Sequence, residues 1–487
     1  NGAGQRVGNF IPFTDTFAVG ASARCDADAD YMTKTFGSST DAQRRTWSLS
    51  LWFKVGTLGG KIFYSSRTGS GHADYAGLNS SDLLYWTGED GTGDSFELKT
   101  NRTFKATDGW THVLFHFDST GATPGASDIY MAVNGVIQVT ADLATETYPN
   151  QNFETDFLST TENVLFSWTV DKSDSWDGYI AEVVCTAGTA YAASSFGETD
   201  TSTNRWIPKD PSGLTFGANG FYLDFADGND LGDDESGNGN DWTEAGFDTT
   251  NGSNQMYGTP SQNFATINPA SDFGSNKTIT EGNLRVLTHG TDYSYVSSTL
   301  GMPATGHWYA EFELVTELGS ESSIFGITIT PYPTSSSDWF TKDGDLAYNS
   351  GGQVREDNAT VETWATFAAG DIMSIRVNLD AATPYAQFYK DGVSAGTRDL
   401  PVSMLNRTLF FGCGDSSASG GEESTWVLNF GQWRYFDSTT LSLDSDAGGY
   451  FRYTAPTDAK ALQQDNLPEN TAGITGLSWI KNRDATD

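Results

Sequence analysis

Apolar and polar residues alternate with a period of two through most of this chain, and this pattern limits the fold more than any other feature. In Thr46–Lys54, the apolar residues Trp47, Leu49, Leu51 and Phe53 fall on one face and polar residues fall on the other, with Trp52 as the exception. Successive side chains of a β-strand point to opposite faces, so this alternation predicts a half-buried strand.

The same pattern recurs in two sets that follow the same order. The first set adds Trp110–Asp118, Asp128–Val139 and Asp177–Cys185, and the second comprises Trp308–Leu314, Ile324–Ile329, Ile372–Leu379 and Ala386–Val393. Asn134-Gly135 in the first set and Asp391-Gly392 in the second separate apolar runs, which is the strongest short-range signal for a type I′ hairpin. We therefore expect an all-β chain built from two related antiparallel jelly-roll sandwiches in tandem.

Changes in composition mark the boundaries between these sets. The predicted organisation is an N-terminal segment (1–14), a first sandwich (15–226), an Asp/Gly/Asn-rich connector (227–261), a second sandwich (262–436), and a linker with the start of a truncated further module (437–487). Within the last part, Gly476–Asn482 predicts a strand. Helix-period segments are few, and Asp458–Asn466 is the best helix candidate.

The charge balance excludes several partners. With 27 basic and 63 acidic residues the formal net charge is −36, which repels phosphate backbones and anionic lipid headgroups. No apolar run approaches the roughly 18 residues that cross a bilayer, and residues 1–25 lack a signal-peptide pattern. We expect neither nucleic-acid binding nor membrane insertion. Because the chain begins with Asn1, its start is either a processed end or the start of a fragment.

The three cysteines are too few for a disulfide framework and lack the spacing of a zinc site. Two interpretations stay open: a Cys25–Cys185 disulfide between neighbouring strands, or three buried thiols at Cys25, Cys185 and Cys413. The thiols are the favoured interpretation.

Short motifs in both halves resemble known β-sandwich families. Trp47–Lys54 (WSLSLWFK), Gly109–Val113 (GWTHV), Tyr130–Gly135 (YMAVNG) and Asp177–Val183 (DGYIAEV) resemble concanavalin A-like, laminin-G-like domains. Gly306–Glu311 (GHWYAE), Gly370–Met373 (GDIM), Phe388–Gly392 (FYKDG) and Val427–Gly431 (VLNFG) resemble SPRY-type domains. The resemblance implies a jelly-roll sandwich in each half.

The order of these modules resembles virion proteins of tailed, particularly marine, bacteriophages. The segments that link the modules, Asp233–Trp242, Thr259–Pro269 and Leu477–Arg483, contribute to that resemblance. It implies a non-enzymatic tail fibre, spike or head decoration on the virion surface, in contact with other virion proteins and attached to host surface polysaccharide. Family resemblance also implies a homo-oligomer, commonly a trimer. Three alternatives stay open: a secreted bacterial adhesin, a polysaccharide hydrolase, and a decoration without any ligand.

Candidate catalytic groups are sparse. Glu311 and Glu313 share a strand face about 6.6 Å apart, but the compact acidic motif of laminarinase-type hydrolases is absent, so we expect solvent-facing carboxylates and no catalytic residue. His112 and His116 lie about 13 Å apart along a strand, too far apart to share a zinc ion.

Two kinds of binding site remain as predictions. Asp227, Asp230, Asp234 and Asn238 supply hard oxygen ligands for calcium, although a connector of Asx turns satisfied by its own backbone is the favoured interpretation. Trp176, Trp339 and Phe340 fall in loops beside polar residues, where an exposed aromatic ring can stack on a sugar. The alternative is that these rings cap their own sandwich or bury against a neighbouring subunit.

Overall fold

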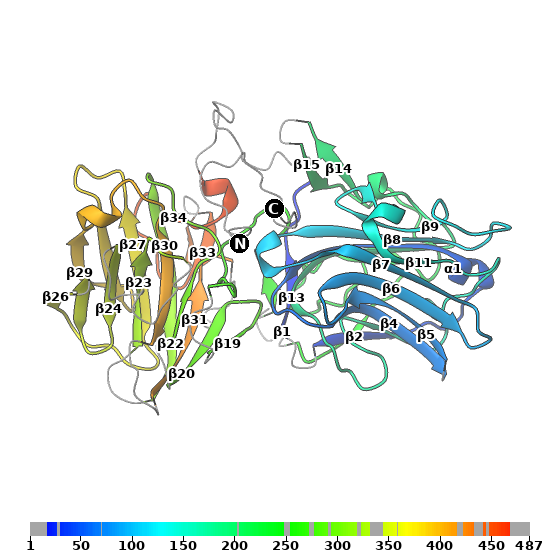
Figure 1. Cartoon of the computed structure of the whole chain (residues 1–487), viewed down its shortest axis with the longest axis horizontal. Coiled ribbons are helices and arrows are strands. Elements are labelled where there is room, and N and C mark those ends of the chain that lie inside the picture. The colour runs from blue at the N-terminus through cyan, green and yellow to red at the C-terminus, as the bar shows by residue number, and fades with distance from the viewer. Residues whose placement is uncertain are drawn as a thin grey trace, which may run out of the picture.

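The computed structural model of this chain is almost entirely β, as the alternation predicted. Apart from the short helix α1 (Asp41–Arg45) and a few 3-10 turns, the regular elements of the described residues are strands. The structure describes residues 17–26, 30–69, 71–201, 204–247, 254–271, 277–290, 294–318, 323–331, 344–357, 359–415, 422–432, 442–444 and 448–467. Figure 1 shows the strands gathered into two sandwiches that lie side by side.

The first sandwich consists of two antiparallel sheets, which we name after central strands. The β3 sheet has the order β10 (Val136–Ile137), β9 (Ile129–Val133), β8 (Thr111–Asp118), β3 (Thr46–Val55), β13 (Asp177–Ala187), β1 (Ser22–Asp26) and β18 (Gln255–Met256), with β16 (Phe221–Leu223) paired to β13. The β6 sheet has the order β11 (Leu143–Thr147), β7 (Ser95–Thr103), β6 (Leu83–Asp90), β5 (His72–Leu78), β4 (Lys61–Gly69), β12 (Glu162–Leu165), β2 (Tyr31–Thr35) and β17 (Thr243–Ala245).

The core between these sheets is rich in aromatic rings. Trp47 is fully buried, its ring stacks on Phe117 at 5.4 Å, and its indole Nε1 donates a hydrogen bond of 3.0 Å to the hydroxyl of Thr155. All four predicted strands of this half are present with their apolar faces turned inward, because the two sheets bury one face of each strand. All three cysteines are buried free thiols, which confirms the favoured interpretation.

Strand β3 differs from the prediction because both of its faces are buried, not one. Its outer face is covered by the hairpin β14 (Gly197–Asp200) and β15 (Arg205–Pro208) with its flanking turns, and by the second sandwich. Trp52, which broke the alternation, packs under this covering layer beside Val19 and Ala181. An apolar residue on the polar face therefore marked a face that is not exposed to water.

The second sandwich repeats the two-sheet arrangement. The β22 sheet has the order β19 (Lys277–Thr280), β20 (Arg285–Gly290), β31 (Glu422–Asn429), β22 (His307–Leu318), β27 (Ile372–Asn378), β28 (Tyr385–Lys390) and β29 (Val393–Asp399), with β34 (Lys460–Ala461) paired to β22. The β23 sheet has the order β21 (Ser294–Ser297), β30 (Phe410–Asp415), β23 (Ser323–Thr328), β24 (Asp345–Asn349), β25 (Gln353–Glu356) and β26 (Ala359–Thr363). Two antiparallel sandwiches in tandem confirm the predicted fold class.

Both predicted hairpin turns have the expected backbone. Asn134 and Gly135 have φ of 47° and 78°, and Asp391 and Gly392 have φ of 49° and 75°. Positive φ at both central positions is what a type I′ turn requires, and Asn, Asp and Gly adopt it at low cost.

The predicted connector, residues 227–261, contributes two strands and buried side chains to the first sandwich in its described residues 227–247 and 254–261. Its strands β17 and β18 pair with β2 and β1, and its side chains Leu231 and Trp242 are buried in the core. The boundary at residue 227 was wrong because the Gly/Asn/Asp composition marks turns but gives no sign of these two short pairings.

The residues after 436 also differ from the predicted linker. Strand β33 (Gly449–Phe451) pairs with β32 (Ser442–Asp444), β34 pairs in parallel with β22, and Leu462 and Leu467 enter the second core. The helix predicted over Asp458–Asn466 is wrong: this stretch holds β34 and the 3-10 turn η6 (Gln464–Asn466). The strand predicted over Gly476–Asn482 lies outside the described residues.

Polar contacts join the two sandwiches. The buried Lys54 on β3 donates through Nζ to Asn263 Oδ1 at 3.0 Å, and Arg24 forms an ion pair with Glu281 at 3.0 Å. The hydroxyl of Tyr179 donates to the carbonyl of Gly282 at 2.7 Å, while the Tyr179 ring packs into the second core. These contacts fix the second sandwich against the outer face of the β3 sheet.

Candidate functional site

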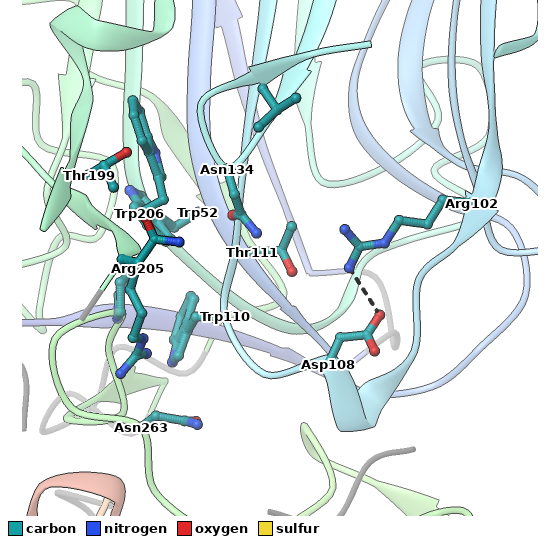
Figure 2. Close-up of a pocket in the computed structure, with 13 residues that line it drawn as sticks. Trp52, Arg102, Asp108, Trp110, Thr111, Asn134, Thr199, Arg205, Trp206 and Asn263 are labelled. Carbon is teal, nitrogen blue, oxygen red and sulfur yellow. Dashed lines mark ion pairs between the residues drawn. The ribbon is translucent and has the colours of Figure 1, made fainter. Parts of the chain in front are cut away.

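A cavity of about 500 Å³ opens beside the outer face of the β3 sheet, where the β14–β15 hairpin, the β9–β10 turn and the loop before β8 meet residues 260–263 (Figure 2). We call it the indole cavity, because three tryptophans line it. The rings belong to Trp52, Trp110 and Trp206, and the charged and amide lining residues are Arg102, Arg205, Asp108, Asn134, Asn204 and Asn263. Aromatic faces beside a few polar groups are typical of small-molecule sites.

Two glycines leave room for the ring of Trp206, the tryptophan on β15. A Cβ added to Gly135 would lie 2.3 Å from the Trp206 ring, and one added to Gly197 would lie 2.5 Å from it. The indole therefore packs closely against the backbone at both glycines. The hairpin turn predicted from the sequence thus has a second role, because its glycine makes room for a wall of the cavity.

This contact gives a prediction for Gly135→Ala. The change combines the cost of positive φ, about 1–2 kcal/mol, with a clash against Trp206. The control is Gly93→Ala, because Gly93 has φ of 101° and nothing within 4 Å of an added Cβ. In urea unfolding we expect Gly135→Ala to lose clearly more stability than Gly93→Ala. Equal losses would show that Trp206 does not rest on this turn.

Three ring nitrogens around the cavity find no hydrogen-bond partner among the described residues: Trp110 Nε1, Trp206 Nε1 and His112 Nδ1. His112 lies between the rings of Trp52 and Trp206, at centroid distances of 5.1 and 5.8 Å. Its Nε2 is 2.8 Å from the Ser50 hydroxyl, and burial lowers its pKa to about 3, so the ring is neutral. All three nitrogens are buried, so they do not face the open part of the cavity.

The polar side chains stand on two sides of the cavity. Figure 2 shows Arg102 and Asp108 on one side, Trp206 and Arg205 on the other, and Asn134 between them. Arg102 and Asp108 form an ion pair at 3.6 Å. The Asn134 side-chain oxygen accepts the backbone N–H of His112 at 2.8 Å, which leaves its amide nitrogen as the group able to bind a ligand.

Of the predicted sugar-stacking residues, Trp176 does not have an exposed ring, so this prediction is wrong. It is fully buried, and its ring packs against Phe53 and Phe63 at centroid distances of 5.6 and 4.6 Å. The ring of Trp176 packs on one end of the aromatic core and so caps its own sandwich, which is the alternative left open above. Trp339 and Phe340 lie outside the described residues.

The predicted calcium segment is built from turns closed by its own backbone. Asp234 accepts N–H bonds from Tyr222, Ser236 and Asn240 at 2.8–2.9 Å, so both carboxylate oxygens have donors. Of the other predicted ligands, Asp227 accepts from Asn229 N–H, Asn238 donates to the carbonyls of Gly217 and Gly220, and Asp230 is exposed. This is the geometry of an Asx-turn connector. Within the described ranges, no three His, Cys, Asp or Glu side chains are grouped to hold a metal.

We therefore expect calcium to leave the melting temperature unchanged. The measurement compares melting of the full chain in EDTA with melting in 1 mM calcium, since an ion that binds only the folded state must raise the melting temperature. An increase of about 5 °C or more would contradict this expectation and support the calcium site.

Glu311 also differs from the prediction of a solvent-facing carboxylate. It is completely buried, because residues 449–461 cover the face of β22 on which it lies. Its oxygens accept backbone N–H groups of Arg452 and Tyr453 at 2.8 and 2.9 Å, and the side chains of Asn429 and Tyr309 at 3.2 and 3.3 Å. Because four groups donate to its carboxylate, Glu311 holds the segment around Arg452 and Tyr453 against β22 and has a structural role.

The comparisons with known proteins agree with the fold. A family model described as the concanavalin A-like lectin/glucanases superfamily matches residues 26–187, which lie in the first sandwich. No curated protein matches the chain. In the residues that the structure describes, no helix has the length and apolar character to cross a membrane.

Solved structures similar to the chain include SPRY domains and laminin domains. The SPRY domain of human HERC1 shares 18% identity with a TM-score of 0.27, covering 31% of this chain and 91% of that one. A human SPRY domain shares 17% with a TM-score of 0.24, covering 31% and 95%. Domains LG4-5 of the mouse laminin alpha1 chain share 11% with a TM-score of 0.29, covering 91% and 90%. At these values the likenesses carry no argument about function, and the fold class rests on the sheets themselves.

Proposed function

We propose that this chain is a non-enzymatic carbohydrate-binding protein and that the indole cavity holds the sugar. The observation that carries the proposal is the gathering of Trp52, Trp110 and Trp206 with amide side chains in one cavity of about 500 Å³. Indole rings offer flat apolar surface to the C–H face of a sugar. The volume falls within the range of about 300–1,000 Å³ that ligand pockets occupy.

The amide of Asn134 supports the same proposal. Its oxygen is engaged by the His112 N–H, so its nitrogen is the group that can donate to a sugar oxygen. The family match to lectins and glucanases over residues 26–187 is consistent with a sugar ligand.

The arrangement of carboxyl groups supports binding rather than hydrolysis. Glycosidases use two carboxyl groups about 5–10 Å apart on either side of the bond that breaks. The lining residues of the indole cavity include a single carboxyl group, Asp108, and it is engaged by Arg102. Glu311, the other candidate, is sealed in the second sandwich.

The test is a glycan array probed with the full chain, followed by a reducing-sugar assay on any polysaccharide that binds. We expect retention of at least one glycan class and no release of reducing ends. Failure to bind any glycan would overturn the proposal, and release of reducing ends would favour the alternative of a polysaccharide hydrolase.

We further propose that the protein is displayed on a bacteriophage virion, as a fibre, spike or decoration that attaches to host polysaccharide. The support is the resemblance of the module order, a laminin-G-like sandwich followed by a SPRY-like one. Other virion proteins would be its structural partners, and a trimer its oligomeric form. Antibody labelling of purified particles tests the location: label on the particle is expected, and label on a bacterial surface instead would favour a secreted adhesin.

A further inference from the structure

We propose that the hairpin β14–β15 is a pH-sensitive flap over the β3 sheet and that the buried side chain of Glu182 controls it. The flap stays closed while Glu182 is protonated and opens when Glu182 ionises. Because Trp206 of β15 forms a wall of the indole cavity, the position of the flap decides whether that cavity is complete. The opening itself needs no ligand, so this inference goes beyond the proposed function.

The flap is held by packing and not by a large sheet. Among the described strands, β14 and β15 form a two-stranded sheet of their own. Phe196 beside β14 and Trp206 on β15 pack on the outer face of the β3 sheet, against side chains such as Leu114 and Val184. An isolated two-stranded hairpin is at best marginally stable in water, so a flap that leaves this face also loses its own hydrogen-bonded ladder.

The backbone of β13 directs Glu182 toward the flap. The register between β13 and β3 shifts between Ala181 and Val184, which marks a β-bulge, and Glu182 lies in this bulge with φ of 51°. A left-handed conformation is unfavourable for a residue other than glycine, and a bulge re-aims the side chains of its strand. The fold therefore accepts backbone strain at the residue that places a carboxyl group under its covering layer.

The surroundings of Glu182 contain little room for water. The residue is 6% exposed, and it lines a cavity of about 10 Å³, enough for a single water molecule. Trp52, Phe196 and Pro208 line the same cavity, so sheet and flap enclose the carboxyl group from two sides. An ionised carboxylate is costly in such a place unless several donors or a cation compensate it.

Glu182 has little of this compensation. The Tyr222 hydroxyl donates to its Oε2 at 2.7 Å, and among the described residues no cation forms an ion pair with it. The charged groups nearby are the carboxylates of Asp224 and Asp210 and the ammonium group of Lys209. That ammonium group donates instead to a backbone carbonyl before β14, at 3.3 Å. The carboxylate form of Glu182 is therefore poorly stabilised while the flap is closed.

Ionisation consequently favours the open flap. Burial raises the pKa of the Glu182 carboxyl to about 8, the Tyr222 hydrogen bond opposes this rise, and the charges of Asp224 and Asp210 add to it. In the open form water reaches the carboxyl, so its pKa returns to the ordinary value. The stability of the closed form is thus complete below that ordinary value and falls as the pH rises to about 8. His112, beneath the same layer, stays neutral throughout because burial lowers its pKa to about 3.

Hydrogen exchange of the full chain measures the opening. The exchange rate of peptides from β14 and β15, divided by the intrinsic rate at each pH, gives the opening equilibrium. We expect this equilibrium to rise about fiftyfold from pH 5.5 to pH 7.5 and to level off above about pH 8, as linkage to one carboxyl group requires. A corrected exchange rate that does not change with pH would overturn the inference.

Variants assign the rise to one carboxyl group. Glu182→Gln still accepts the Tyr222 hydroxyl but cannot ionise, so it should abolish the rise. Glu89→Gln, which removes an exposed carboxyl group on β6, should leave the rise unchanged. An equal rise in the unaltered chain and in Glu182→Gln would overturn the inference, and so would loss of the rise in Glu89→Gln.

A third variant keeps the test decisive if Glu182→Gln does not fold. Tyr222→Phe removes the hydrogen bond that favours the ionised carboxylate, so the pKa of Glu182 in the closed form should increase. The exchange rate should then keep rising to a higher pH before it levels off. Levelling at the same pH as in the unaltered chain would show that another group controls the flap.

Discussion

Replacing Glu311 with glutamine is expected to lower the free energy of unfolding of the second sandwich by about 2–5 kcal/mol. The carboxylate accepts four hydrogen bonds in a fully buried position, and glutamine turns one oxygen into a donor that faces two donors. Each buried donor deprived of its acceptor costs about 1–3 kcal/mol. The loss is large because no water reaches the site to replace the missing acceptor.

Two measurements check this expectation. Urea unfolding gives the stability loss, and hydrogen exchange of residues 448–467 shows whether the segment held by Glu311 opens first. The control is Asp399→Asn, because Asp399 is exposed on β29 of the same sandwich. If Glu311→Gln and Asp399→Asn unfold at the same urea concentration, Glu311 does not anchor the segment.

The second large effect concerns binding. Trp206→Ala is expected to weaken binding of any glycan found on the array at least tenfold, because it removes the ring that forms a wall of the indole cavity. Loss of a stacked ring from a ligand site commonly costs about 1–3 kcal/mol, which corresponds to about tenfold or more in affinity. Fluorescence or calorimetric titration measures the change.

A matched tryptophan on another face provides the control. Trp168 is partly exposed beyond the outer face of the β6 sheet, where its ring contacts Tyr75 at 4.8 Å. Trp168→Ala removes the same area of indole without touching the indole cavity, so affinity should be retained. Loss of affinity in Trp168→Ala but not in Trp206→Ala would move the binding surface to the β6 sheet.

The fold was predictable where local patterns decide it. The strand over Thr46–Lys54 and the turns at Asn134-Gly135 and Asp391-Gly392 depend on residues close in sequence, and the strand and both turns are present in the structure. Pairings between distant segments were not predictable in this way. Strands β17, β18 and β34 are two or three residues long, which is too short for an alternating pattern to reveal them.

The candidate site depended still more on distant contacts. Trp176 and Trp206 both sit among polar neighbours in the sequence, yet Trp176 closes the core and Trp206 lines the cavity. Glu311 is buried because its donors come from residues about 140 positions later in the chain. One signal was present: Trp52, the apolar exception on a polar face, marks where the covering layer and the cavity lie.

The most direct test of the account is a crystal structure of the full chain with the oligosaccharide that binds most tightly. We expect ordered sugar in the indole cavity, with a ring against Trp206 and an oxygen within hydrogen-bond distance of the Asn134 amide nitrogen. Sugar ordered elsewhere, on the outer face of the β6 sheet or on the second sandwich, with an empty indole cavity would contradict it.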